Sequence, residues 1–152
     1  MVDLNSKAPD FTLEGSDGRM HSLNEFLGKY LVLYFYPRDD TPGCTIEAKG
    51  FSSKIDEIRK LGADVVGISK DDSLSHASFC SKYGLKILLL SDSSSEVIKS
   101  YGAYGSRGIF GAGTLRKTFI IDKEGKIAKV FEKVNPNGHE NEIILAIKEL
   151  EK

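Results

Sequence analysis

The sequence predicts an α/β fold in which a central mixed sheet is flanked by helices. Three buried strands alternate with helical segments along the first two thirds of the chain, the order that parallel crossover connections produce. Two further strands separated by a short turn predict an antiparallel hairpin, and an amphipathic helix closes the chain. The 152 residues are enough for one hydrophobic core, so we expect a single domain over residues 1–152.

The first third of the chain is expected to form a hairpin, a buried strand and a long helix. Residues 11–23 alternate in polarity around a Ser-Asp-Gly turn, which predicts a small N-terminal β-hairpin. Residues 29–37 are rich in β-forming apolar side chains and end at Pro37, as in a strand buried on both faces. In the helix that follows, apolar residues recur every three or four positions, and Gly62 is suited to its C-terminal end.

The rest of the chain continues this alternation. Two buried strands, two helices, a hairpin and a closing helix are expected at residues 63–71, 86–92, 73–83, 96–101, 114–134 and 140–150, respectively. The glycine-rich residues 102–113 (GAYGSRGIFGAG) lack the strand-then-helix context of a phosphate-binding loop. They are expected to form either a plain surface connection or a mobile loop that gates the active site.

Composition excludes several classes of function. The net charge is −1 and no basic stripe interleaves with aromatic residues, so we expect no binding of nucleic acid. The longest apolar runs are far shorter than the roughly 20 residues that span a bilayer, so no membrane association is expected. The N-terminal residues lack the pattern of a secretory signal, and we therefore expect a cytoplasmic protein.

The chain has two cysteines, and the first lies where a buried strand gives way to a helix. Thr41 suits the N-cap, Pro42 suits the first helical position, and Cys44 then falls in the first turn. Unpaired backbone N–H groups and the helix dipole favour an anion there, so the reactive thiolate form is favoured. The residues around it are polar, and Gly43 leaves room for a substrate, so we interpret Cys44 as a reactive, exposed thiol rather than a core thiol.

Most thiol chemistries need a second group that the sequence does not supply near this cysteine. A phosphatase-like site needs an arginine six residues later, and this position is Gly50. A Cys-x-x-Cys redox pair is absent, and His21, His76 and His139 have no context that indicates a hydrolase base. What remains is a thiolate that attacks an oxidant.

The motif around this cysteine resembles the active site of a known family. The stretch PRDDTPGC fits Pro-x-x-x-Thr-x-x-Cys, the peroxiredoxin signature, at Pro37, Thr41 and Cys44. FYPRDDTPGCTIEAKGF and RKTFIIDKEGKI are similar to the bacterioferritin-comigratory-protein (PrxQ) subfamily, and Arg116 matches its active-site arginine. APDFTL, VVGISKD and LLSD also match in order, so the resemblance covers essentially the whole chain. It implies a thioredoxin-like fold and a thiol-dependent peroxidase with no metal or organic cofactor, often monomeric.

The resemblance also implies roles for the residues of the motif. Cys44 would take oxygen from H2O2 or an alkyl hydroperoxide and become a sulfenic acid. Thr41 would hold the peroxide, Arg116 would stabilise the negative charge, and Pro37 would shield the thiolate. Glu47, one turn after the cysteine, is either a group that orients the arginine or a solvated carboxylate. Arg38 is a weaker alternative partner for the sulfur.

The second cysteine is the candidate resolving residue. Many members of the subfamily carry this thiol five residues after the first, where this chain has Lys49. A second arrangement places it in the next crossover helix, and Cys80 lies in that region. We expect a Cys44–Cys80 disulfide, formed after local unwinding and reduced by a thioredoxin- or glutaredoxin-like donor. The alternatives are a core thiol beside Phe79, a static structural bridge, or a one-cysteine mechanism that uses an external thiol.

Three other interpretations are weaker. His76 and Cys80 share a helix face, but two ligands do not make a metal site, so no metal is expected. A thioredoxin-like disulfide oxidoreductase would reduce protein disulfides and consume little peroxide. A non-enzymatic holdase or interaction module would be insensitive to replacement of Cys44.

Overall fold

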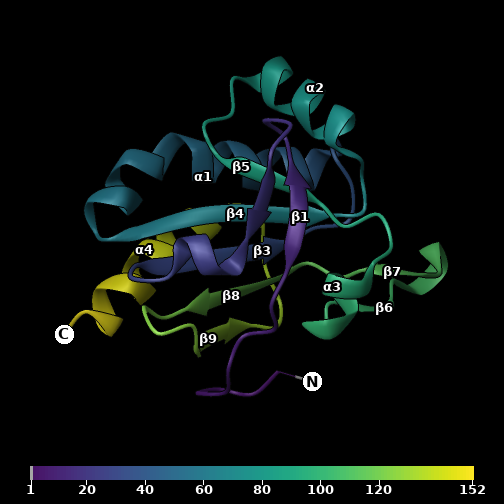
Figure 1. Ribbon diagram of the computed structural model, residues 1–152. Coiled ribbons are helices and arrows are strands. Elements are labelled where there is room, and N and C mark those ends of the chain that lie inside the picture. Colours follow the sequence, from purple (N-terminus) through teal and green to yellow (C-terminus); the bar gives the residue numbers. More distant parts are fainter. Residues whose placement is uncertain (1) are drawn as a thin grey trace.

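The computed structural model describes residues 2–152, and its centre is a seven-stranded mixed sheet with the strand order β2-β1-β5-β4-β3-β8-β9 (Figure 1). The strands are β1 (Thr12–Gly15), β2 (Met20–Ser22), β3 (Tyr30–Phe35), β4 (Ala63–Ser69), β5 (Leu88–Ser91), β8 (Lys117–Ile121) and β9 (Ile127–Phe131). β3, β4 and β5 are parallel to one another, whereas β1, β8 and β9 join antiparallel. The predicted mixed sheet is confirmed.

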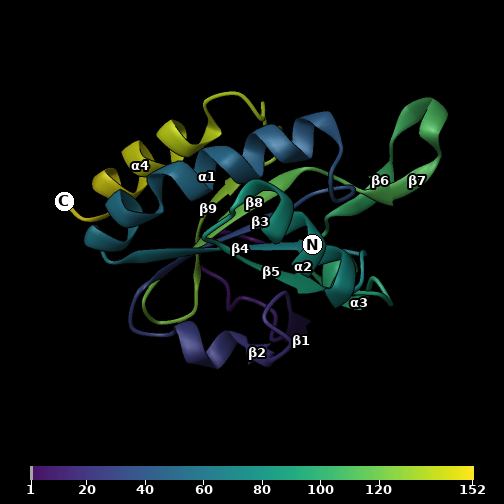
Figure 2. The same ribbon diagram turned by 90° about the horizontal axis from the view of Figure 1, so that it is seen from above.

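Helices cover both faces of this sheet. They are α1 (Pro42–Lys60), α2 (Ser73–Tyr83), α3 (Glu96–Ser100), α4 (His139–Leu150) and the short 3-10 helices η1 (Leu23–Phe26) and η2 (Gly108–Phe110). Figure 2 shows α1 and α4 side by side on one face of the sheet and η1 on the other. The sheet therefore separates two layers of core.

Strand β3 contributes to both layers because alternate side chains point to opposite faces. One layer receives Val32, Tyr34 and Tyr36, and the other receives Leu31, Leu33 and Phe35. All six side chains are buried. Burial on both faces explains why this strand is an unbroken apolar run rather than an alternating one.

The ends of the predicted elements agree well with the structure. Gly62 and Gly84 adopt positive φ angles of 81° and 61° just after α1 and α2, which glycine permits without strain. The predicted N-terminal hairpin is present as β1–β2, and it also pairs with β5, with Gly15 opposite Leu90. The hairpin therefore extends the central sheet instead of standing apart from it.

Residues 102–113 differ from the plain connection that was one of the two expectations. They contain β6 (Tyr104–Ser106), η2 and β7 (Ala112–Thr114), which form a two-stranded antiparallel sheet of their own. The hairpin projects from the body of the molecule (Figure 2), and at its tip Ile109 and Phe110 are 96% and 75% exposed. Glycine is depleted in strands, so its abundance concealed this hairpin in the sequence.

No helix within residues 2–152 is both long enough and apolar enough to span a bilayer.

Candidate active site

Cys44 lies in the first turn of α1, directly beyond the carboxyl end of β3. Open α/β sheets place their sites at this edge. Thr41 occupies the N-cap position with extended backbone, and the Thr45 N–H donates to its carbonyl over 2.8 Å. Pro42 begins the helix, as predicted. The first-turn N–H groups have no intrahelical partners, so this position stabilises negative charge on a side chain.

The side chain of Thr41 does not cap the helix, contrary to the expectation for an N-cap threonine. Its hydroxyl instead donates to the carbonyl of Arg38 over 2.9 Å. With its hydrogen used in this way, the hydroxyl oxygen can only accept a hydrogen bond from a ligand. That ability suits the O–H group of a hydroperoxide.

The sulfur of Cys44 is not exposed, and this corrects the expectation drawn from its polar neighbours in the sequence. The residue is 1% exposed and belongs to the apolar layer beneath α1, together with Tyr34 and Ala48. Neighbours such as Pro42 point outward from the same helical turn. Because the thiol is buried in the first turn, it is shielded from water and its polar contact is with a charged side chain.

That partner is Arg116, which precedes β8. Both terminal nitrogens of its guanidinium, Nη1 and Nη2, lie 3.5 Å from the sulfur of Cys44. Burial opposes the charge of this guanidinium, but the neighbouring Cys44 and Glu47 outweigh it and raise the pKa of Arg116. The arginine therefore stays cationic and can neutralise charge at the sulfur.

Glu47 orients this arginine, which confirms one of the two alternatives for it. Its Oε1 accepts from Nη1 of Arg116 over 2.8 Å, and its side chain is completely buried. Burial raises the pKa of Glu47 from 4.5 to about 7, although the nearby guanidinium acts in the opposite direction. Its second oxygen, Oε2, has no hydrogen-bond partner within residues 2–152. A solvated helix carboxylate is therefore excluded.

The glycine beside the cysteine makes room for this arginine. A Cβ atom at Gly43 would lie 3.0 Å from Nη2 of Arg116 and 3.5 Å from Cγ of Pro136. From the sequence we expected the absence of a side chain at Gly43 to admit a substrate, but the guanidinium of Arg116 occupies much of this space. Pro136, in the connection between β9 and α4, is a neighbour of the site that no sequence signal indicated.

The other predicted residues lie at the edge of this group. Pro37 lies two residues beyond the end of β3 and is half-buried. Arg38 is exposed, and the guanidinium at the sulfur belongs to Arg116 instead. The weaker alternative for Arg38 was therefore wrong.

Cys80 lies on α2 and is half-buried against the same apolar layer as Cys44. Both cysteines are free thiols. Burial raises the pKa of Cys80, a hydrogen bond with Ser16 opposes this rise, and Asp39 adds to it. Its sulfur lies 4.0 Å from the carbonyl of Ile87. Within residues 2–152, the groups that act on this second thiol are Ser16, Asp39 and the carbonyl of Ile87, none of which is a cation like the Arg116 beside Cys44.

The histidines are occupied elsewhere. His21 contacts Asp17 and Glu25, and His139 lies between Thr118 and Glu142 at 2.9 and 3.0 Å. The part of the chain that the structure describes contains no group of three or more His, Cys, Asp or Glu side chains that could hold a metal ion. The polar partner of the Cys44 sulfur is a guanidinium rather than an imidazole base.

A buried sulfur paired with a fixed cation, without a base or an adjacent second thiol, is suited to attack an oxidant and not an ester or amide. On a thioredoxin-like sheet, this arrangement defines the class of thiol-dependent peroxidases. Residues 4–130 match the model of the AhpC/TSA family, so the chain belongs to this family, which contains the peroxiredoxins.

The relatives narrow the assignment to the bcp, or PrxQ, subfamily. The chain is 44% identical over 146 residues to "Putative peroxiredoxin bcp" of Helicobacter pylori, covering 94% of this chain and 96% of the relative. It is 43% identical to chloroplastic peroxiredoxin Q of Arabidopsis thaliana, over 97% of this chain and 68% of that protein.

Solved structures agree with this assignment. A cysteine-to-serine mutant of Xylella fastidiosa PrxQ superposes with a TM-score of 0.96 at 28% identity, covering 100% of this chain and 99% of the other. Xanthomonas campestris bacterioferritin comigratory protein superposes with a TM-score of 0.91 at 32% identity, over 100% and 99% of the two chains. The predicted fold, family and enzyme class are confirmed.

Proposed function

We propose that this peroxiredoxin reduces H2O2 and alkyl hydroperoxides through Cys44. The observation that carries this assignment is the guanidinium of Arg116, with two nitrogens 3.5 Å from the sulfur. The Cys44 thiolate attacks one peroxide oxygen, an S–O bond forms and the O–O bond breaks. The leaving oxygen takes the electron pair and a proton and departs as water or an alcohol, and Cys44 becomes a sulfenic acid.

The neighbouring residues serve this step by position. Arg116 stabilises the negative charge that passes from the sulfur to the leaving oxygen. Glu47 holds the guanidinium of Arg116 in the orientation that allows contact with both atoms. The hydroxyl oxygen of Thr41 accepts the hydrogen of the hydroperoxide, because its own hydrogen is held by Arg38. Pro37 shields the entrance. The bacterioferritin comigratory protein of Xanthomonas campestris has alkyl peroxide reduction activity, and this similarity supports an alkyl hydroperoxide as substrate here.

The proposed resolving residue is Cys80. Its sulfur would attack the sulfenic acid, forming the S–S bond and releasing water. A disulfide requires Cα atoms within about 7 Å of each other, and a thiolate in the first turn of α1 is expected to lie further than this from α2. We therefore infer that one or both segments unwind locally after oxidation. Gly50 within α1 favours this movement, since a glycine costs a helix about 1 kcal/mol relative to alanine.

A thioredoxin- or glutaredoxin-like donor would then reduce the bridge by thiol–disulfide exchange. The end-to-end match to the bcp and PrxQ relatives supports one domain over residues 1–152. The resemblance to the subfamily also supports a monomer that uses no metal or organic cofactor, and location in the cytoplasm stays a prediction from the sequence.

A second candidate keeps the same first step but resolves Cys44 with an external thiol. The raised pKa of Cys80 favours this one-cysteine mechanism, because a protonated thiol is a poor nucleophile.

Peroxide consumption, measured first with a small dithiol and then with a thioredoxin-like donor, separates the candidates. The first three outcomes refer to the small dithiol. The wild type and Cys80→Ser should both consume peroxide, and Cys44→Ser should not. With a thioredoxin-like donor, Cys80→Ser should lose turnover if the disulfide forms, and should retain it under the one-cysteine mechanism. Efficient reduction of protein disulfides without peroxide consumption would instead support an oxidoreductase.

A further inference from the structure

Helix α2, which carries Cys80, is held to the body of the protein by few apolar contacts. Of its residues only His76 and Phe79 are buried, Cys80 and Tyr83 pack against the core while partly exposed, and Leu74 is 78% exposed. Figure 1 shows the helix at the periphery of the fold. A helix with so little apolar burial depends on polar contacts for its position.

The strongest of these contacts meet at Asp39, in the connection between β3 and α1. Its Oδ1 accepts from the hydroxyl of Tyr36 over 2.5 Å. Its Oδ2 accepts from the hydroxyl of Ser75 over 2.8 Å and faces Nδ1 of His76 at 2.7 Å. The backbone N–H of Asp39 donates to Asp71 over 2.8 Å. The Asp39 side chain is only 4% exposed, so its contacts with Tyr36 and His76 are shielded from water, whereas those with Ser75 and Asp71 are partly buried.

His76 is fixed at both ring nitrogens. Nε2 faces the carbonyl of Leu90 at 2.9 Å, and since a carbonyl only accepts, this nitrogen carries a hydrogen. Nδ1 shares a second hydrogen with the Asp39 carboxylate, so the pair is neutral as a whole. The ring is fully buried, and separation of the pair would leave a buried charge without a partner.

The pair joins the two segments that carry the cysteines. Asp39 lies five residues before Cys44, and His76 lies four residues, about one helical turn, before Cys80. We propose that Asp39 and His76 form a latch that positions α2, and that opening of this latch sets the rate at which Cys80 reaches the oxidised Cys44. The inference rests on the proposed resolving role of Cys80.

The step itself needs no further reactant. Peroxide has already oxidised Cys44 to the sulfenic acid, and Cys80 supplies the second sulfur. The S–S bond forms, the S–O bond breaks, and the departing hydroxide takes the proton of Cys80 to leave as water. Asp39 and His76 are positioning residues because they act on the helix and do not touch the reacting sulfurs.

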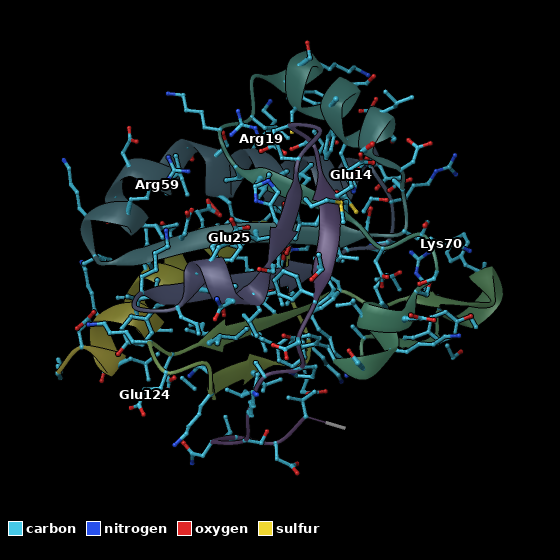
Figure 3. All side chains as sticks on the ribbon, viewed as in Figure 1. Glu14, Arg19, Glu25, Arg59, Lys70 and Glu124 are labelled. Atoms are coloured by element: carbon cyan, nitrogen blue, oxygen red, sulfur yellow. The ribbon has the colours of Figure 1, made fainter. Side chains whose placement is uncertain are left out.

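Other polar contacts of α2 are exposed and serve as controls. Asp40 accepts from Lys82 over 2.7 Å and from Tyr83 over 2.6 Å, but both members of the ion pair are largely exposed. Ser73 donates to Glu14 on β1 over 2.7 Å at the surface, where Figure 3 labels Glu14. Exposed ion pairs contribute little to stability, so these contacts should not control the opening.

The test is a quench-flow measurement with one equivalent of H2O2, in which sulfenic acid and disulfide are counted by mass after thiol alkylation. His76→Leu should form the disulfide at least about tenfold faster than the wild type, since the loss of a buried charge-assisted bond loosens α2. Sulfenic acid formation should stay within about twofold, because His76 does not contact the sulfur of Cys44. His76→Asn, which keeps a donor near the Nδ1 position, should fall between the two.

Asp40→Asn is the matched control, one residue along the chain and bound to the same helix. Asparagine tolerates the positive φ of 57° at this position, so the backbone is preserved. This variant should form the disulfide at the wild-type rate. Should His76→Leu fail to fold, Ser75→Ala removes one donor to Asp39 and should accelerate the step about threefold.

The outcomes are distinguishable. An unchanged or slower disulfide phase in His76→Leu, with both phases present in the wild type, would overturn the latch alone. Equal acceleration in Asp40→Asn would also overturn it, because any loosening of α2 would then suffice. If the wild type forms sulfenic acid but no disulfide, the resolving role of Cys80 fails together with the latch. If no sulfenic acid forms at all, the peroxidase assignment of Cys44 fails first.

Discussion

Replacement of Glu47 with glutamine should remove a pH-dependent loss of stability that the buried carboxyl imposes. Burial raises the pKa of Glu47 from 4.5 to about 7 in the folded protein. At roughly 1.4 kcal/mol for each pH unit between 4.5 and about 7, this raised pKa corresponds to about 3–4 kcal/mol. Because the folded pKa is the higher one, the folded state binds more protons over this interval. The stabilising contribution is fully present below pH 4.5 and is lost as the pH rises to about 7.

The measurement is urea unfolding of Cys44→Ser and of Cys44→Ser/Glu47→Gln from pH 4.5 to 8. The shared serine removes ionisation of the neighbouring thiol, and circular dichroism is the probe because the chain has no tryptophan. The stability of the glutamine variant relative to its parent should rise by about 3 kcal/mol across this range. Histidines and surface carboxyls titrate in both proteins and cancel. A difference that stays constant with pH would refute the reasoning, since it would mean that burial does not hold the proton on Glu47.

Three further predictions follow from particular contacts. Arg116→Lys should lower kcat/KM for peroxide by about 100-fold, because a single ammonium cannot reproduce the two contacts at 3.5 Å with the sulfur of Cys44. Steady-state kinetics with a dithiol measure this loss, and activity within about threefold of wild type would contradict the prediction. Gly43→Ala should lower peroxidase activity about tenfold, since its Cβ would lie 3.0 Å from the guanidinium of Arg116. Its Tm should change little, because alanine favours the helix. An equal loss of activity in Ile46→Ala, at an exposed position of the same helix, would contradict the prediction. Phe51→Ala removes a fully buried ring whose centroid lies 4.8 Å from that of Tyr34, and it should lower the free energy of unfolding in urea by about 3–5 kcal/mol. Phe110→Ala, at the exposed tip of the β6–β7 hairpin, should lower it by less than about 0.5 kcal/mol. Similar losses for both variants would contradict the assigned core.

The strands and helices could be predicted because their signals are local. The apolar run before Pro37 and the glycines at positions 62 and 84 each reflect a constraint within a few residues. The β6–β7 hairpin was missed since its strands are short and rich in glycine, and backbone pairing rather than side-chain pattern holds them together. Local signals therefore predicted the central sheet but not the β6–β7 hairpin.

The site was predicted in part, and the division follows distance along the chain. The first-turn position of Cys44 can be deduced from its neighbours, but the contact with Arg116 spans 72 residues and was available only through the family motif. Burial of the sulfur was missed because polar neighbours in sequence do not determine which way one helical side chain points. The pair of Asp39 with His76 spans 37 residues; Asp39 occupies an unspecified position of the family motif, and His76 lies outside it. Such long-range contacts needed the folded structure.

Counting thiols tests whether Cys44 is the nucleophile that takes an oxygen atom from peroxide and Cys80 its resolving partner. Fully reduced protein receives one equivalent of H2O2 without added reductant, and the remaining thiols and peroxide are measured. The wild type should lose both thiols for each peroxide consumed, Cys80→Ser should lose its single thiol to sulfenic acid, and Cys44→Ser should consume no peroxide. Peroxide consumption by Cys44→Ser at the wild-type rate would contradict the role of Cys44.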